Sequence, residues 1–427
     1  MSSLWRRRRL GLRHLLFISV LVLFFATTYE LHLRWRYSSW LLDLEAYNQQ
    51  VVHESSVPLH HPPRILLVSS LFPLSKSKHS WSEYSQWLNY FTSLHDTPIY
   101  LFLPAAVASE LLPGPLPPNL TINTTYNHIW DLPPVSQVHS SFEEMWHLDR
   151  EKNIHGAELY AVWSAKPWFT EQGMKNMGGA DRWDYVFWND AGSFRDPHPF
   201  KAWPAPERIH RIWEQVGGRG ESKVFFPIFN TFKPRDRYWK EEDGPVDEEI
   251  SIGSFFGGPP SAIEWYTSVF YTYRDYYISK SFFVGKDQTF INALILLFPS
   301  RFIGVHHNYP HSVAWRLPSS VLDHRWLRYI RKKYLTSWLV TRALGRCKSE
   351  YMYYQFFLAD KASRDELQEK WLVEARDIWD DLYRNRDDEE IDRCRMTEPI
   401  SFEYSLRRED VFGRDWKPPH RSLVISS

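Results

Sequence analysis

The sequence of 427 residues predicts an α/β fold, a Rossmann-type mixed sheet flanked by helices. Arg64–Leu71 and Pro98–Leu103 are short apolar runs, as in strands that are buried on both faces of a parallel sheet. Ser80–Leu94 lies between them, carries large apolar side chains at helical spacing and offers Ser80 as an N-cap. Strand, helix and strand in close succession predict a βαβ unit with a right-handed crossover.

The pattern continues downstream, where strands and helices again alternate. We expect helices at Ala157–Gly173, Ile263–Ser279 and Asp287–Leu297. We expect strands at Tyr185–Trp188, Ile252–Phe256 and Arg301–Val305. The C-terminal third is charged in blocks, which favours helices on the surface of the domain.

The N-terminus predicts a membrane anchor. Five arginines precede an apolar run, and a helix over residues 15–33 just reaches across a bilayer. Basic residues before the span keep the N-terminus cytosolic, so we expect a single-pass type II protein of the ER or Golgi membrane with its body in the lumen. A cleaved signal peptide is the alternative, although Ala26-Thr27-Thr28 is a poor cleavage site. The expected parts are a cytosolic tail at 1–14, the anchor at 15–33, a stem at 34–62, the α/β domain at 63–317 and a helical extension at 318–427.

Two further features agree with a lumenal body. Asn119 and Asn123 each begin a glycosylation sequon. The sequence holds only two cysteines, Cys347 and Cys394, which an oxidising lumen would allow to pair, although their spacing does not require it.

Composition excludes some partners. Basic and acidic residues number 51 each, so nothing favours nucleic acid. Aromatic residues make up 17% of the chain, which suits either a core or stacking platforms for sugars. Oligomeric state is not predicted.

The most informative segment is DYVFWNDAGSFR, residues 184–195. A buried strand runs into Asp190 and then a glycine, and open α/β sheets bind ligands at such strand ends. The alternative is a turn that Asp190 caps. His306 also ends an apolar strand, and it is either structural or a metal ligand.

Sugar transfer from a nucleotide diphosphate requires that the diphosphate charge be neutralised and the acceptor hydroxyl oriented. Where Mn²⁺ or Mg²⁺ does this, carboxylates hold the ion, and Asp190 and His306 are the candidate ligands. The second carboxylate of a DxD pair is missing, because that position is Gly192.

Cations and a second carboxylate complete the predicted site. Tyr160, Trp163 and Lys166 share one helix face, and Pro167 predicts that a new helix begins there and fixes the lysine at a bend. Lys166 and Arg195 are candidate partners of phosphate oxygens, with a solvated lysine as the alternative. Asp287 and Gln288 begin a helix after a glycine: Asp287 is either a cap or a catalytic base, with Gln288 holding a neighbouring hydroxyl.

With these motifs the chain resembles the HtrL/YibB family of glycosyltransferase-like proteins, over roughly residues 64–310. The specific patterns are YAVWSAKPW at 160–168 and WNDAGSFR at 188–195, and FFGG at 255–258 and the DQ pair are weaker. The resemblance implies a GT-A-like fold with the donor nucleotide at the carboxyl ends of the first strands. In that reading the donor site also includes Tyr160, Trp163, Gly192, Gly257 and Gly258.

The sequence thus predicts a type II membrane glycosyltransferase that moves a sugar from a nucleotide-sugar donor to a glycan or glycoconjugate. Two alternatives stay open. One is an inactive GT-A-fold scaffold, which the glycine at position 192 favours. The other is a membrane-tethered carbohydrate-binding protein, which only the aromatic content favours.

Overall fold

The computed structural model describes one compact unit of the chain, made of residues 61–217, 222–306, 347, 351–374, 394, 396–408 and 411–423. The expected anchor at 15–33 lies outside these residues, as does nearly all of the expected stem. No helix within the described ranges is long and apolar enough to cross a membrane.

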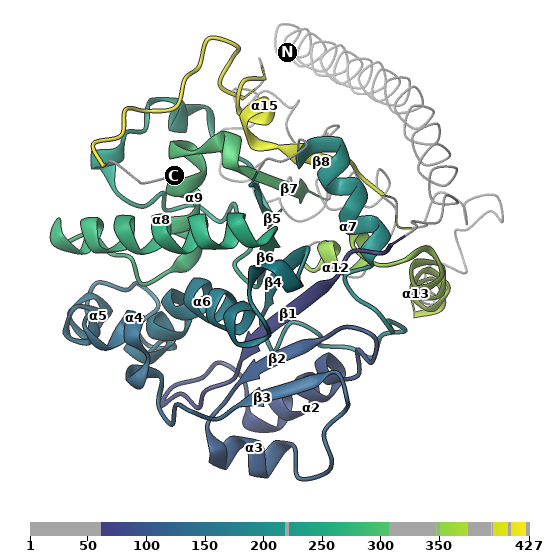
Figure 1. Cartoon of the computed structure of the whole chain (residues 1–427). Helices are drawn as coiled ribbons and strands as arrows, with labels where there is room; N and C mark the ends of the chain where they lie inside the picture. The colour runs from purple at the N-terminus through teal and green to yellow at the C-terminus, as the bar shows by residue number, and fades with distance from the viewer. Residues whose placement is uncertain are drawn as a thin grey trace, which may run out of the picture. The chain divides into compact units, whose positions relative to one another are not determined.

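The centre of this unit is a mixed sheet of eight strands in the order β3-β2-β1-β4-β6-β5-β7-β8 (Figure 1). β6 and β8 run antiparallel to their neighbours, and the other pairings are parallel. The strands are β1 Ile65–Ser70, β2 Ile99–Phe102, β3 Leu120–Asn123, β4 Tyr185–Asn189, β5 Val224–Ile228, β6 Phe255–Gly258, β7 Phe302–His306 and β8 Pro399–Ser401.

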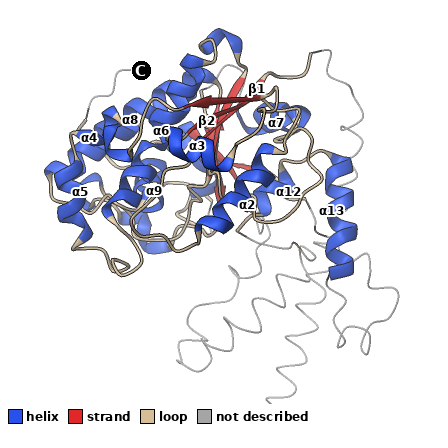
Figure 2. Cartoon of the chain, turned by 90° about the horizontal axis from the view of Figure 1, so that it is seen from below, coloured by secondary structure: helices blue, strands red, loops and turns tan. Residues whose placement is uncertain are grey.

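Helices cover both faces of the sheet, and Figure 2 shows the strands enclosed between them. Alternate residues of β1 point to opposite cores, Leu66 and Val68 to one and Ile65 and Leu67 to the other. The first core is covered by α4 Pro133–Ser136, α5 His139–Trp146, α6 Ala157–Asn176, α8 Pro260–Ser279, α9 Asp287–Leu297 and α15 Phe402–Leu406. The second is covered by α2 Trp81–Thr92, α3 Ala105–Leu111, α7 Pro206–Ile212, α12 Tyr353–Phe357 and α13 Lys361–Glu374.

The order of the strands creates a switch point between β1 and β4. From β1 the chain passes through α2 to β2 and through α3 to β3, moving to one side, and α2 and α3 pack on one face. It then crosses through α6 on the opposite face and returns as β4 on the other side of β1. Ligands of open α/β sheets bind at the carboxyl ends of strands beside such a reversal.

The predicted first βαβ unit is present with nearly the expected bounds. Ser80 caps α2 in a capping box with Glu83, as a serine three residues before a glutamate allows. The expected strands at 64–71 and 98–103 are β1 and β2, which pair in parallel. Local patterns determined these elements.

The prediction that a new helix begins at Pro167 is wrong. Pro167 lies inside the continuous helix α6. A proline there cannot donate to the Trp163 carbonyl one turn earlier. Two hydroxyls of α8 donate to other carbonyls of this part of the helix. The hydroxyl of Tyr271 donates to the Ser164 carbonyl (3.0 Å), and that of Thr267 donates to the Pro167 carbonyl (3.2 Å).

The expectation of a purely helical C-terminal extension from residue 318 also needs correction. Within the described part of this segment, β8 joins the sheet as an edge strand beside β7. Tyr354 and Phe357 of α12 are fully buried in the second core. These residues belong to the α/β unit and do not decorate it.

Candidate functional site

A pocket of about 440 Å³ opens at the switch point. It is bounded by the ends of β1 and β4, the residues before β6, one face of α6, the rings of α2 and the start of α9. Because β6 runs antiparallel to β4, its first residues lie beside the end of β4, and the Asp190 N–H donates to the Ser254 carbonyl (2.8 Å). The predicted site residues that line the pocket are Trp163, Lys166, Asp190, Gly192, Arg195, Asp287 and Gln288.

Lys166 joins two carboxylates in this pocket. Its Nζ lies 2.9 Å from Asp287 Oδ2 and 3.2 Å from Asp190 Oδ1, and it donates to the Gly253 carbonyl at 2.9 Å. Burial disfavours the ammonium, but the charges of Asp190 and Asp287 outweigh burial and raise the pKa of Lys166. An ammonium has three hydrogens, and these three partners use them, so Lys166 has none left for phosphate oxygens.

Asp190 is the carboxylate that faces the open part of the pocket. Its side chain is 33% exposed, whereas that of Asp287 is 8% exposed. Oδ1 also accepts from the Trp188 indole N–H at 2.6 Å. Burial raises the pKa of Asp190 and the charge of Asp287 adds to this, while Lys166 and Trp188 only partly oppose it.

Asp287 is held from several sides. It is the first residue of α9, and its Oδ1 accepts from the Gln288 backbone N–H (2.9 Å) while Oδ2 binds Lys166. A Cβ at Gly253 would lie 2.4 Å from Oδ2, so only glycine leaves room for this carboxylate. The Gln288 amide donates to the Ser251 carbonyl at 2.8 Å, which leaves its side-chain oxygen for the pocket. The N-cap of α9 is Lys286, so the predicted capping role of Asp287 is wrong, and its carboxylate instead holds Lys166.

The missing second carboxylate at Gly192 has a packing reason. A Cβ there would lie 3.0 Å from the Trp87 ring and 3.3 Å from the Tyr84 ring. Both rings come from α2 and line the pocket. A larger residue would therefore crowd these rings, so the tight aromatic packing favours glycine over the second carboxylate of a DxD pair.

Arg195 is the exposed cation at the pocket. Its guanidinium lies 4.7 Å from the centre of the Trp87 ring, and Nε contacts the Gly192 carbonyl at 3.5 Å. Among the residues that the structure describes, no carboxylate pairs with it. Lys286 also lines the pocket, but its Nζ lies 3.7 Å from Glu249 and 3.9 Å from Glu151. Arg195 is therefore the better placed to meet an anion.

The sequence predicted that Asp190 and His306 hold a divalent metal ion, but the residues of the pocket do not fit such an ion. Among the residues that the structure describes, Asp190 and Asp287 are the carboxylates that line the pocket, and both already bind the Lys166 ammonium. The second predicted ligand, His306, does not line the pocket at all. Its Nε2 lies 2.9 Å from the Phe229 carbonyl, and burial lowers the pKa of His306 to about 4, so the ring is a neutral donor inside the fold.

Three of the predicted donor-site residues also lie elsewhere. Gly257 and Gly258 are inside β6, where a Cβ would lie 2.3 Å from the Val186 carbonyl or 2.4 Å from the Lys223 carbonyl, so close strand packing explains both. Tyr160 is buried, and its hydroxyl donates to Asp149 Oδ2 at 2.5 Å. Only Trp163 of the aromatic pair on α6 reaches the pocket.

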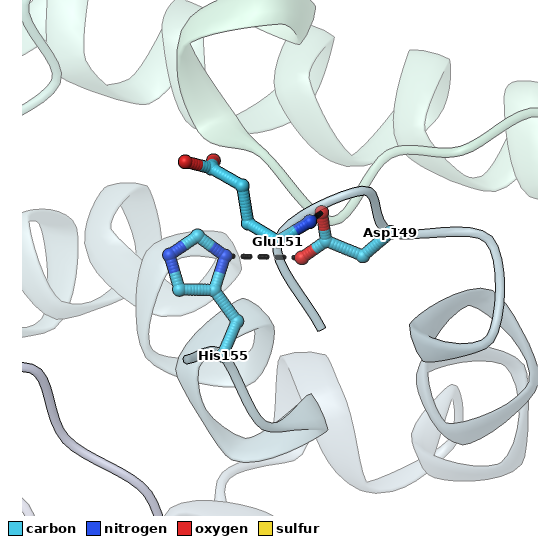
Figure 3. A group of neighbouring side chains, drawn as sticks. All are labelled: Asp149, Glu151 and His155. Atoms are coloured by element: carbon cyan, nitrogen blue, oxygen red, sulfur yellow. Dashed lines mark hydrogen bonds and ion pairs between the residues drawn. The ribbon is translucent and has the colours of Figure 1, made fainter. Parts of the chain in front are cut away.

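Tyr160 belongs to a separate polar cluster. Asp149, Glu151 and His155 lie close enough together to share a metal ion. In the described ranges they are the one group of three acidic, histidine or cysteine side chains that does so. In Figure 3 the Asp149 carboxylate accepts from the His155 ring (3.0 Å) and the Glu151 N–H (2.8 Å), while the Glu151 carboxylate extends away. Burial opposes ionisation, but these donors and Tyr160 together lower the pKa of Asp149. The cluster ties a loop to α6.

The structure also describes the two cysteines and the two asparagines of the predicted glycosylation sites. Cys347 and Cys394 form a disulfide. The Asn119 amide donates to the carbonyls of Leu94 (2.6 Å) and Thr97 (2.7 Å), so a glycan on this nitrogen would break at least one of these bonds. Asn123 donates to the Tyr100 hydroxyl at 2.8 Å.

Several pocket residues escaped sequence reasoning. Gly253 and Ser254 precede the FFGG motif, and a glycine before a strand was a usable signal. Tyr84 and Trp87 show only the spacing of a helix packed on a core. Tyr351 also lines the pocket, but it is distant in sequence from the other lining residues, and the residues around it form no pattern that indicates a binding site.

No protein-family model matches this chain, and no curated protein is significantly similar to it in sequence. The resemblance to the HtrL/YibB family remains a prediction. The functional argument therefore rests on the geometry of the pocket.

Proposed function

We propose that the protein is a glycosyltransferase that moves a sugar from a nucleotide-sugar donor to a glycan or glycoconjugate acceptor, with a GT-A-like domain. The observation that carries the proposal is the pocket at the β1–β4 switch point, which holds two carboxylates, an exposed arginine and an aromatic wall. Nucleotides bind at such crevices, and about 440 Å³ lies within the range of ligand pockets. The WNDAGSFR motif supplies part of this pocket.

Each pocket residue has a role in this proposal. Transfer breaks the bond between the sugar and the diphosphate, forms a glycosidic bond to the acceptor and releases a proton from the acceptor hydroxyl. Arg195 binds the diphosphate, whose charge grows as it leaves. Asp190 accepts the hydroxyl hydrogen, a task that suits a partly exposed carboxylate with a raised pKa. Asp287 and Lys166 position Asp190.

We also propose the cellular setting that the sequence predicts. The Cys347–Cys394 disulfide supports an oxidising compartment. The N-terminal arginines and apolar run support a type II anchor in the ER or Golgi membrane, with this body in the lumen.

One alternative has an observation in its favour. Lys166 already neutralises one of the two carboxylate charges, and a third carboxylate at position 192 would crowd the rings of Trp87 and Tyr84. A GT-A-fold scaffold without activity would tolerate both features. Donor binding separates the two functions only when it is measured together with turnover.

The test is thermal unfolding of the full-length protein with a panel of nucleotide diphosphate sugars. At about 100 Kd, a donor that binds only the folded state stabilises it by about 2.7 kcal/mol. Arg195→Ala should lower the affinity of the protein for that donor about tenfold or more, because the substitution removes a charged hydrogen bond. Arg182→Ala is the matched control, since Arg182 is an exposed arginine that stacks on Trp183 and does not line the pocket. If no donor stabilises the protein, the proposal is wrong.

A further inference from the structure

The surroundings of the Lys166 ammonium are those of a hard metal ion. Its three partners are all oxygens, two from carboxylates and one from the Gly253 carbonyl. Mg²⁺, Mn²⁺ and Ca²⁺ prefer this donor set. The nitrogen–oxygen distances of 2.9–3.2 Å exceed metal–oxygen distances by about 1 Å, so a small inward movement of the oxygens would suit an ion.

The ammonium and a divalent ion exclude each other at this position. The Lys166 Nζ lies between the three oxygens, so an ion could take this position only if the ammonium moved away. With the lysine present, the cluster of Lys166, Asp190 and Asp287 carries one net negative charge. Without it, the negative charges of the nearly buried Asp287 and the partly exposed Asp190 face each other, which strongly favours a divalent cation.

We propose that Lys166 stands in the place of the divalent cation, so that the pocket binds its ligand without a resident metal and becomes a metal site when the ammonium is removed. The statement about the ligand rests on the proposed function. The statement about the metal depends only on the three side chains and the Gly253 carbonyl.

The test of the metal statement is a Mn²⁺ titration of the full-length protein followed by electron paramagnetic resonance of the free ion. Lys166→Ala should gain one saturable site that binds Mn²⁺ at least tenfold more tightly than any site of the unchanged protein. Adding Asp287→Asn to this variant should abolish the site. Lys175→Ala is the matched control, because Lys175 lies on the same helix, pairs with Glu171 and is 49% exposed.

The Asp149–Glu151–His155 cluster could bind Mn²⁺ independently, so all variants are repeated with Glu151→Gln. If Lys166→Ala does not fold in the absence of metal, Lys166→Gln replaces it. Failure of both variants to gain a site overturns the proposal. So does tight Mn²⁺ binding by the unchanged protein that survives Glu151→Gln and is lost with Asp190→Asn.

The ligand statement has a separate readout. A nucleotide sugar that stabilises the unchanged protein should do so equally in Mn²⁺ and in a chelator. A donor effect that needs Mn²⁺ contradicts the inference but keeps the proposed function. The absence of any donor effect contradicts the proposed function and leaves the result of the Mn²⁺ titration intact.

Discussion

Asp190 and His306 both stand at the carboxyl end of a buried strand in the same sheet, but their surroundings differ. Asp190 follows β4, is 33% exposed and pairs with the charged Lys166. His306 ends β7, is 3% exposed and lies against the Phe229 carbonyl at 2.9 Å. One strand end opens into a pocket and keeps a charge, while the other is closed and neutral.

The position of each strand in the sheet explains the difference. β4 lies beside β1, where the direction of the chain across the sheet reverses and the crevice remains open. β7 lies between β5 and β8, and the residues that lead into β8 cover its end, since the Thr397 hydroxyl donates to the His306 carbonyl (3.1 Å). Strand order, and not the polar residue at the strand end, determines which end can bind a ligand.

The largest expected effect comes from removing the charge that supports Asp190. Lys166→Met leaves the nearly buried Asp287 and the partly exposed Asp190 without their cation and should lower the free energy of unfolding by about 3–5 kcal/mol at pH 7. Denaturant unfolding measures this. Lys175→Met, at a surface pair with Glu171, should change it by less than about 1 kcal/mol. Equal effects of the two substitutions would contradict the account of the pocket.

A smaller effect should appear at the closed strand end as pH falls. The unfolded His306 takes up a proton near pH 6.5, but the folded one does so only near its pKa of about 4. The unfolded state therefore binds more protons in this window, and stability present above pH 6.5 is lost on acidification, by roughly 3 kcal/mol at pH 4. Unfolding free energies at pH 7, 5.5 and 4 measure it.

His306→Gln should flatten this dependence, because glutamine can donate to the same carbonyl and does not titrate. His139→Gln serves as the control, since His139 is 42% exposed and pairs with Glu143 on the surface. An unchanged pH dependence in His306→Gln would show that the ring is not the neutral buried donor described above.

Local sequence patterns predicted much of this fold. Ser80 and its helix, β1 and β2 depend on neighbouring residues and appear as expected. β5 was missed because Pro227 interrupts its pattern, and β8 because it has only three residues.

The site was predicted in composition but not in arrangement. The sequence singled out Lys166, Asp190 and Asp287, and all three meet in the pocket. Lys166 binds Asp190, Asp287 and the Gly253 carbonyl, which are 24, 121 and 87 residues away in sequence. No local pattern encodes contacts between such distant segments. His306 was chosen for the same local reason as Asp190, and only the strand order separates them.

The most direct test of the proposed function compares these two strand ends in one assay. Release of nucleoside diphosphate is measured at pH 7, from a nucleotide sugar that stabilises the protein, with the unchanged chain, Asp190→Asn and His306→Gln. We expect Asp190→Asn to fold normally and lose on the order of 100-fold or more in rate, because it lacks the acceptor of the hydroxyl proton. His306→Gln should keep the rate of the unchanged chain. Full activity in a folded Asp190→Asn protein, or an equal loss in both variants, would contradict the assignment of catalysis to this pocket.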